Sequence, residues 1–249
     1  MPKYLTMADV SEAMRYAEKL QLSVDRLEEA EVDKLDLFID RVLKLYYPER
    51  EIREIILRHK AEIVLGAMVA KKQLGREFDG EEPRAGTFGV TITRAAFFGI
   101  GDDWEDAAPF STGSPQNWIH SGTTLLGGTA GNPIKIGENA VHVVIAIGSL
   151  HPSPKIESIK FSINGAEKPV ITLGWLIKTA DITIRELEKS MILKKNDTAL
   201  AKVFISAKYG SSVDDYPFLL GVSYLPEDIL RLHDAAEIAK STTKVVLTT

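Results

Sequence analysis

The chain has 249 residues, of which 45% are hydrophobic and 26% charged, and its formal net charge is −5 at pH 7. This is the balance of a globular protein with a sizeable core, and the acidic charge argues against a surface that adheres broadly to nucleic acid or anionic lipid. The chain contains no cysteine, which excludes disulfides, thiolate metal sites and a cysteine nucleophile.

The first 75 residues show apolar side chains at helical spacing, which predicts three helices. The first spans Met7–Leu20, with Thr6 as its N-terminal cap. The second begins near Ser23, a candidate cap. The third begins at Pro48, because a missing N–H is tolerated in a first helical turn, and ends at Gly75.

A change in composition follows these helices. The segment REFDGEEPRAG is charged, contains glycine and proline and lacks periodicity, which is typical of a linker. We therefore predict a helical region at 1–75, a linker at 76–86 and a β-rich domain at 87–249. The expected fold class is α+β, with three helices followed by a mainly antiparallel β-sandwich or jelly-roll-like domain and a C-terminal helix.

The second part of the chain is rich in β-branched and aromatic residues. The predicted strands lie at Phe88–Phe98, Ile134–Ile136, Val141–Ile147, Ala201–Ser206 and Phe218–Tyr224. Residues Asp181–Ser190 are ambiguous, because their start alternates like a strand whereas RELEKS favours a helix. Helical spacing returns at Pro226–Lys240, where we expect the C-terminal helix.

The clearest local signal is KIESIKFSINGAEKPVI. Asn164-Gly165 supplies the positive φ angles of a tight turn, and Ile159, Phe161 and Ile163 alternate with polar residues before it. This pattern predicts a β-hairpin. The segment MILKKNDTALAKVFI predicts a second hairpin with its tip at Lys194–Asp197.

No motif for catalysis or cofactor binding is present. GxxxxGK[ST], dinucleotide-type glycine spacing, GxSxG and HExxH are all missing. The histidines are scattered, at His59, His120, His142, His151 and His233. We expect His59 and His233 on helix surfaces and His142 inside an apolar strand, with structural or solvated roles. We predict no catalytic residue, no cofactor and no enzymatic activity.

One loop, GDDWED, is dense in oxygen ligands of the kind that calcium and magnesium prefer. Its candidate metal ligands are Asp102, Asp103, Glu105 and Asp106, grouped around Trp104. The loop lacks the EF-hand pattern, and a solvated acidic loop pinned by a buried tryptophan is the simpler interpretation.

Neither a signal peptide nor a membrane span is expected. The N-terminus is amphipathic and acidic, whereas a signal peptide is basic and then apolar. The longest apolar stretches, such as Ala140–Leu150, fall short of the about 20 residues that cross a bilayer. We also find no nucleic-acid-binding signature.

The runs IESIKFSINGAEKPVI and PFLLGVSYLPEDILR resemble segments of viral major capsid proteins of the jelly-roll type. This resemblance covers about a third of the chain. It implies a structural protein that self-assembles into a viral capsid or similar shell, with copies of itself as partners. The expected location is then the virion, and otherwise the cytoplasm.

An alternative interpretation is a carbohydrate- or calcium-binding β-domain protein or a hydrolase. In it, Trp104 and Trp118 stack on a sugar while the GDDWED carboxylates bind its hydroxyls or calcium. The N-terminal helices then act as a dimerisation module.

Overall fold

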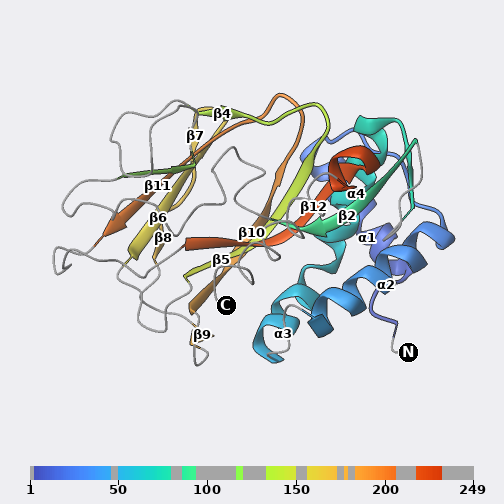
Figure 1. Cartoon of the computed structure of the whole chain (residues 1–249), viewed down its shortest axis with the longest axis horizontal. Helices are drawn as coiled ribbons and strands as arrows, with labels where there is room; N and C mark the ends of the chain where they lie inside the picture. The colour runs from blue at the N-terminus through green and yellow to red at the C-terminus, as the bar shows by residue number, and fades with distance from the viewer. Residues whose placement is uncertain are drawn as a thin grey trace, which may run out of the picture.

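The computed structural model describes residues 3–45, 50–79, 86–93, 116–119, 133–149, 156–172, 177–178, 183–205 and 217–231. Over these residues the chain is an α+β protein in which helices come first and two mostly antiparallel sheets follow (Figure 1). Among the described helices, none is both long enough and apolar enough to cross a bilayer.

The described residues of the helical region form four helices, so the prediction of three is wrong. They are α1 (Met7–Leu20), α2 (Glu29–Leu45), α3 (Arg50–Arg58) and α4 (Lys60–Leu74). The third predicted helix is interrupted at His59, whose φ of −99° and ψ of 25° depart from helical values. The break separates α3, which keeps one exposed face, from α4, which is buried on almost all sides.

The predicted ends of the helices are partly confirmed. Thr6 precedes α1, and both its backbone N–H and its hydroxyl donate to the carboxylate of Asp9. Gly75 ends α4 with a φ of 61°, a value that glycine adopts without strain. The second helix begins at Glu29, six residues after the predicted cap at Ser23.

The strands form two sheets, here called sheet A and sheet B. In sheet A the order is β1 (Glu77–Phe78), β2 (Thr87–Ile92), β12 (Pro217–Pro226), β5 (Val141–Ser149), β10 (Thr183–Leu193) and β9 (Ile177–Lys178). In sheet B the order is β3 (Gln116–Ile119), β11 (Thr198–Ile205), β6 (Ile156–Ile163) and β7 (Ala166–Glu167), with β4 (Ile134–Lys135) paired to β11 and β8 (Ile171–Thr172) paired to β6. Among the described pairings, only β1–β2 is parallel.

The first predicted hairpin is confirmed. β6 and β7 pair on either side of Asn164 and Gly165, whose φ angles are 53° and 75°. The second predicted hairpin is wrong, because β10 belongs to sheet A and β11 to sheet B. Residues 194–197 therefore connect the two sheets. The ambiguous segment at 181–190 contributes to β10 from Thr183 onward, and of the predicted C-terminal helix residues 227–231 are described and helical.

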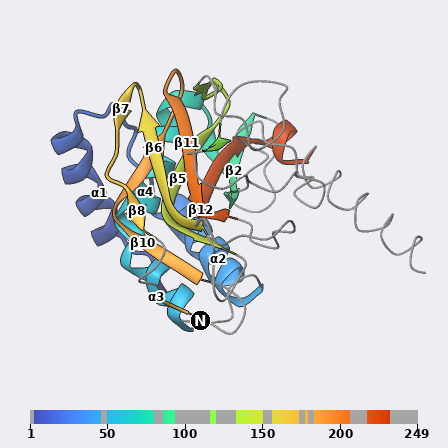
Figure 2. The ribbon, with the colours of Figure 1, turned by 90° about the vertical axis from the view of Figure 1, so that its left-hand side faces the viewer.

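Sheet A is the middle of three layers, between the helices and sheet B (Figure 1). Figure 2 views the molecule from the side of sheet B. Along β5, Val143 and Ile145 pack into one core with the helices, whereas Val144 and Ile147 pack into a second core with sheet B. The predicted domain division remains a prediction. Within the predicted linker, residues 77–78 form β1.

The contact between α4 and sheet A is unusually close at one point. Gly66 of α4 lies where a Cβ atom would be 2.2 Å from Val143 Cγ2 and 2.8 Å from Tyr224 Cε2. Beside it, the buried hydroxyl of Tyr224 donates a 2.6 Å hydrogen bond to the backbone oxygen of Ile63. The missing side chain at Gly66 therefore allows the helix to sit on the sheet.

We expect Gly66→Ala to lower the free energy of unfolding by about 1–3 kcal/mol, because the added methyl group overpacks the helix–sheet contact. Urea denaturation measures this change. Gly137→Ala is the matched control, since its Cβ meets no atom within 4 Å, and it should change stability by less than about 0.5 kcal/mol. Equal effects of the two substitutions would contradict the close contact.

Candidate functional site

The residues predicted to bind a metal, Asp102, Asp103, Glu105 and Asp106, lie outside the described residues, as do His120, His151 and His233. The metal-binding prediction therefore stays a prediction. The structure does describe His59 and His142, and each lies in a polar network. The described residues include no group of three His, Asp or Glu side chains able to hold a metal ion.

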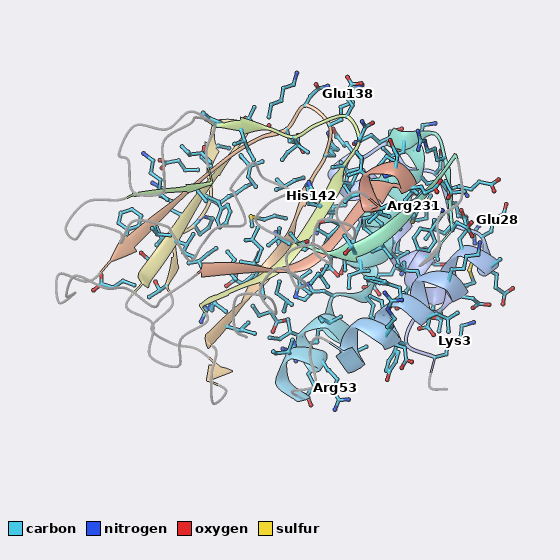
Figure 3. All side chains as sticks on the ribbon, in the orientation of Figure 1. Lys3, Glu28, Arg53, Glu138, His142 and Arg231 are labelled. Atoms are coloured by element: carbon cyan, nitrogen blue, oxygen red, sulfur yellow. The ribbon has the colours of Figure 1, made fainter. Side chains whose placement is uncertain are left out.

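His142 lies inside β5, as predicted, with 1% of its surface exposed (Figure 3). Its Nδ1 atom is 2.8 Å from Ser223 Oγ on β12, and Ser223 in turn donates to Thr93 Oγ1 at 3.2 Å. Burial lowers the pKa of His142 to about 4. The ring is therefore neutral at physiological pH.

Ser223 is completely buried, so a substrate could not reach it as it would have to reach a serine nucleophile. The network therefore joins strands of sheet A and satisfies polar groups in the core.

His59 is the centre of a second network, which we call the His59 cluster: Arg58, His59, Glu62 and Glu186. His59 Nε2 is 3.1 Å from Glu186 Oε1 on β10, and His59 Nδ1 is 3.4 Å from Glu62 Oε1 on α4. Arg58 donates two hydrogen bonds to the same Glu186 carboxylate. Its Nε lies 3.0 Å from Oε1, and its Nη2 contacts Oε2.

Two irregularities of the backbone meet at this cluster. One is the helix break at His59, and the other is a β-bulge in β10. On the two sides of the bulge, Glu186 pairs with Ala146 of β5 and Met191 pairs with Val144. Bulges re-aim side chains and are frequent beside functional sites.

The cluster opens onto a surface depression of about 390 Å³. Its lining consists of the four cluster residues together with Leu187 and Glu188, which follow Glu186 into the bulge. We treat this depression and the His59 cluster as the candidate functional site, because it combines ionisable groups from α3, α4 and β10.

The charges within the cluster reinforce one another. Burial lowers the pKa of His59, but the carboxylates of Glu62 and Glu186 outweigh burial and raise it above the ordinary value of 6.5. Burial raises the pKa of Glu62, yet His59 brings it below 4.5. Arg58, with a smaller contribution from His59, lowers the pKa of Glu186 against the effect of burial. At mildly acidic pH, below the ordinary pKa of 6.5, His59 is therefore an imidazolium between two carboxylates.

The sequence interpretation of His59 as a helix-surface residue is wrong, because only 5% of its surface is exposed. The spacing of His59 and Glu62 places both within one helical turn and could have indicated a local pair. Glu186 is 127 residues away in the chain, and no local pattern connects it to His59.

The protein should lose stability between about pH 6.5 and pH 4. His142 has a pKa of about 4 when folded and about 6.5 when unfolded, so the unfolded chain binds more protons in this window. The full difference between the folded and unfolded pKa values of His142 corresponds to about 3 kcal/mol of the free energy of unfolding. His59 does not oppose this loss of stability. Its pKa is raised in the folded state, so the stability that it contributes is already complete below pH 6.5.

Urea unfolding at about pH 7, 5.5 and 4.5 measures this loss, and a His142→Gln variant should show a flatter dependence than the wild type. The same slope in both proteins would mean that His142 is not held in its neutral form.

Comparison with known proteins assigns no family to the chain. No known family and no curated protein matches the sequence. Among solved structures, the insecticidal delta-endotoxin Cry8Ea1 from Bacillus thuringiensis is similar over 61% of this chain and 25% of its own length, with 12% identity and a TM-score of 0.25. The chain thus spans about a quarter of the endotoxin.

Two carbohydrate-binding modules show likenesses of the same order. A family 35 module from an environmental isolate is 13% identical over 49% of this chain and 93% of its own, with a TM-score of 0.22. The CBM36-1 domain of a xylanase from the hindgut metagenome of Trinervitermes trinervoides is 12% identical over 54% of this chain and 95% of its own, also at 0.22. Likenesses at this level assign neither fold nor function.

Proposed function

We propose that the protein is a structural subunit that assembles with copies of itself into a shell, with its two sheets forming a β-sandwich of the jelly-roll kind. The observation that carries this proposal is that, in the described part of the chain, buried ionisable side chains bind one helix or strand to another. Their polar atoms are used to fix helices to sheets, which is what a rigid building block requires.

Two acidic residues of α2 illustrate this use. The carboxylate of Asp36 accepts hydrogen bonds from the backbone N–H groups of Tyr4 and Leu5, at 2.7 and 2.6 Å. Glu31 Oε2 lies 2.7 Å from Lys71 Nζ on α4, and Glu31 Oε1 accepts from the N–H of Phe78 in β1. Glu31 thereby joins two helices to the first strand of sheet A.

A second group of links reaches the turn between the two sheets. Gln73 of α4 donates to the backbone oxygens of Glu138 and Ala140 and accepts from the N–H of Lys195. The nearly buried Asp197 accepts from the side chain of Asn164 at the β6–β7 turn. These bonds hold the helical layer, sheet A and sheet B in one arrangement.

Most of the apolar side chains that the structure describes on the helices are covered by contacts within the chain, whereas Leu20 and Leu37 are exposed. Their buried side chains share one core with sheet A, and they include Val10, Ala13, Leu35, Ile39, Ile63 and Met68. A dimerisation module needs an apolar helical face that remains uncovered. The described packing therefore favours the structural interpretation over a chain that dimerises through its helices.

Over the described residues, the edges of sheet A are protected against uncontrolled pairing. Sheet A ends in the two-residue strands β1 and β9, and β10 carries a bulge together with the exposed charges of Arg185, Glu188 and Lys189. Short, bulged and charged edges resist addition of another strand. Copies of the chain are therefore expected to meet through side chains on their surfaces.

The mass of the native protein tests this proposal. Multi-angle light scattering after size exclusion, followed by negative-stain imaging, should reveal regular particles many times heavier than the 27.5 kDa chain. A species that stays at 27.5 kDa across protein concentration, salt and pH would overturn the proposal.

The melting temperature distinguishes the calcium- or carbohydrate-binding alternative from the shell proposal. A ligand that binds only the folded state raises that temperature. The alternative expects a rise with calcium that disappears in the Asp102→Asn/Asp106→Asn variant, whereas the structural proposal expects assembly of that variant to remain normal.

A further inference from the structure

The His59 cluster joins the neighbouring helices α3 and α4 to β10, which is far from them in the sequence. Its central group is a histidine, whose charge changes near neutral pH. We propose that His59 is a pH-sensitive joint between the start of α4 and β10, closed while its imidazole is protonated and loosened when the ring becomes neutral. This inference does not depend on the shell proposal.

The closed form follows from the distances. Protonated His59 carries an N–H at each ring nitrogen, and a carboxylate oxygen lies 3.1 Å from Nε2 and 3.4 Å from Nδ1. The ring is enclosed, and Nδ1 makes no well-aligned hydrogen bond, so its interaction with Glu62 depends on charge. Opposite charges on His59 and Glu62 hold the first turn of α4 in place.

Loss of the proton removes one of the two contacts. If His59 keeps the N–H that faces Glu186, the lone pair of Nδ1 faces the Glu62 carboxylate across 3.4 Å with no proton between them. If it keeps the other N–H, the contact with Glu186 is lost instead. The enclosed Nδ1 atom is almost inaccessible to water, so solvent cannot replace the lost interaction there.

The neighbouring charges determine how far the joint can move. On α3, Arg58 retains its two contacts with Glu186 whatever the state of His59, because a guanidinium does not titrate in this range. The electrostatic neighbour of Arg58 on the same helix is Glu54. On β10, Glu188 lines the depression beside Glu186. The connection between α3 and β10 therefore persists, and the loosening is confined to the start of α4.

The helix α1 contributes one further titratable group. Tyr16 interacts with Glu12 and more weakly with Glu62, and these carboxylates raise its pKa above the ordinary value of 10. The pKa of Glu62 itself lies below 4.5. Tyr16 and Glu62 therefore keep their charge states between about pH 5 and pH 9, while His59 changes.

The backbone of His59 provides two direct reporters of this change. The N–H of His59 donates to Ile56 O at 3.1 Å, and the N–H of Ile63 donates to His59 O at 3.0 Å. The first bond joins the residue of the helix break to α3, and the second joins it to α4. At the opposite end of α4, the N–H of Gly75 donates to Lys71 O at 3.0 Å and serves as an internal control.

Amide hydrogen exchange of the wild-type protein, followed by NMR and corrected for intrinsic rates, tests the joint. Between about pH 5.5 and pH 8.5, protection of the His59 and Ile63 amides should fall severalfold, by up to roughly tenfold per unit of raised pKa. The sign follows from the raised pKa of His59, whose stabilisation is complete below 6.5 and is lost as pH rises through the folded value. Protection of Gly75 should not follow this change.

Two variants separate the joint from a general effect of pH. Glu62→Gln removes the charge that faces Nδ1 and should flatten the response of both reporter amides. Glu188→Gln changes a residue of the same depression, and it should preserve the response because the pKa of His59 is raised by Glu62 and Glu186.

The inference is overturned if His59 and Ile63 follow Gly75 at every pH, or if the two variants respond alike. Should Glu62→Gln fail to fold, the comparison of amides within the wild-type protein decides the question. A protein that is monomeric but shows the expected exchange profile would contradict the shell proposal and leave the joint intact.

Discussion

The seating of α4 on sheet A is the contact on which the other layers depend. α4 is buried on almost all sides because α1 packs against it and sheet A lies beneath it. The approach is possible only where the helix lacks a side chain, at Gly66, and it is secured by the hydroxyl of Tyr224. Since sheet A also forms one wall of the core shared with sheet B, the position of one helix influences the packing of both sheets.

Local features of the sequence predict local structure well in this protein. Thr6, Gly75 and Asn164-Gly165 mark ends and turns because the backbone geometry they favour is determined by their own side chains or by the lack of one. Strand pairing is different. β10 and β11 are separated by a four-residue connection typical of a hairpin, yet each pairs in a different sheet, because pairing depends on residues distant in the chain. The acidic metal-site candidates, in contrast, stay a prediction.

The two described histidines show why residue type alone does not determine chemistry. Both are buried, but His142 has hydroxyl neighbours and a lowered pKa, whereas His59 lies between carboxylates and has a raised pKa. One carboxylate partner of His59, Glu62, is three residues away in the sequence, and the other, Glu186, comes from β10. The sequence spacing can indicate the first partner but not the second.

The place of β12 in sheet A has a consequence for the synthesis of the protein. β12 is the last described strand, yet it lies between β2 and β5, and the other described strands of sheet A leave the ribosome before it. Until residue 226 has emerged, β2 and β5 have no common neighbour, and the apolar side chains of the helices lack part of the surface they cover. The nascent chain must therefore postpone this assembly step until β12 has emerged. Such late pairing of strands distant in the sequence is slow, and it exposes the unpaired strands to aggregation.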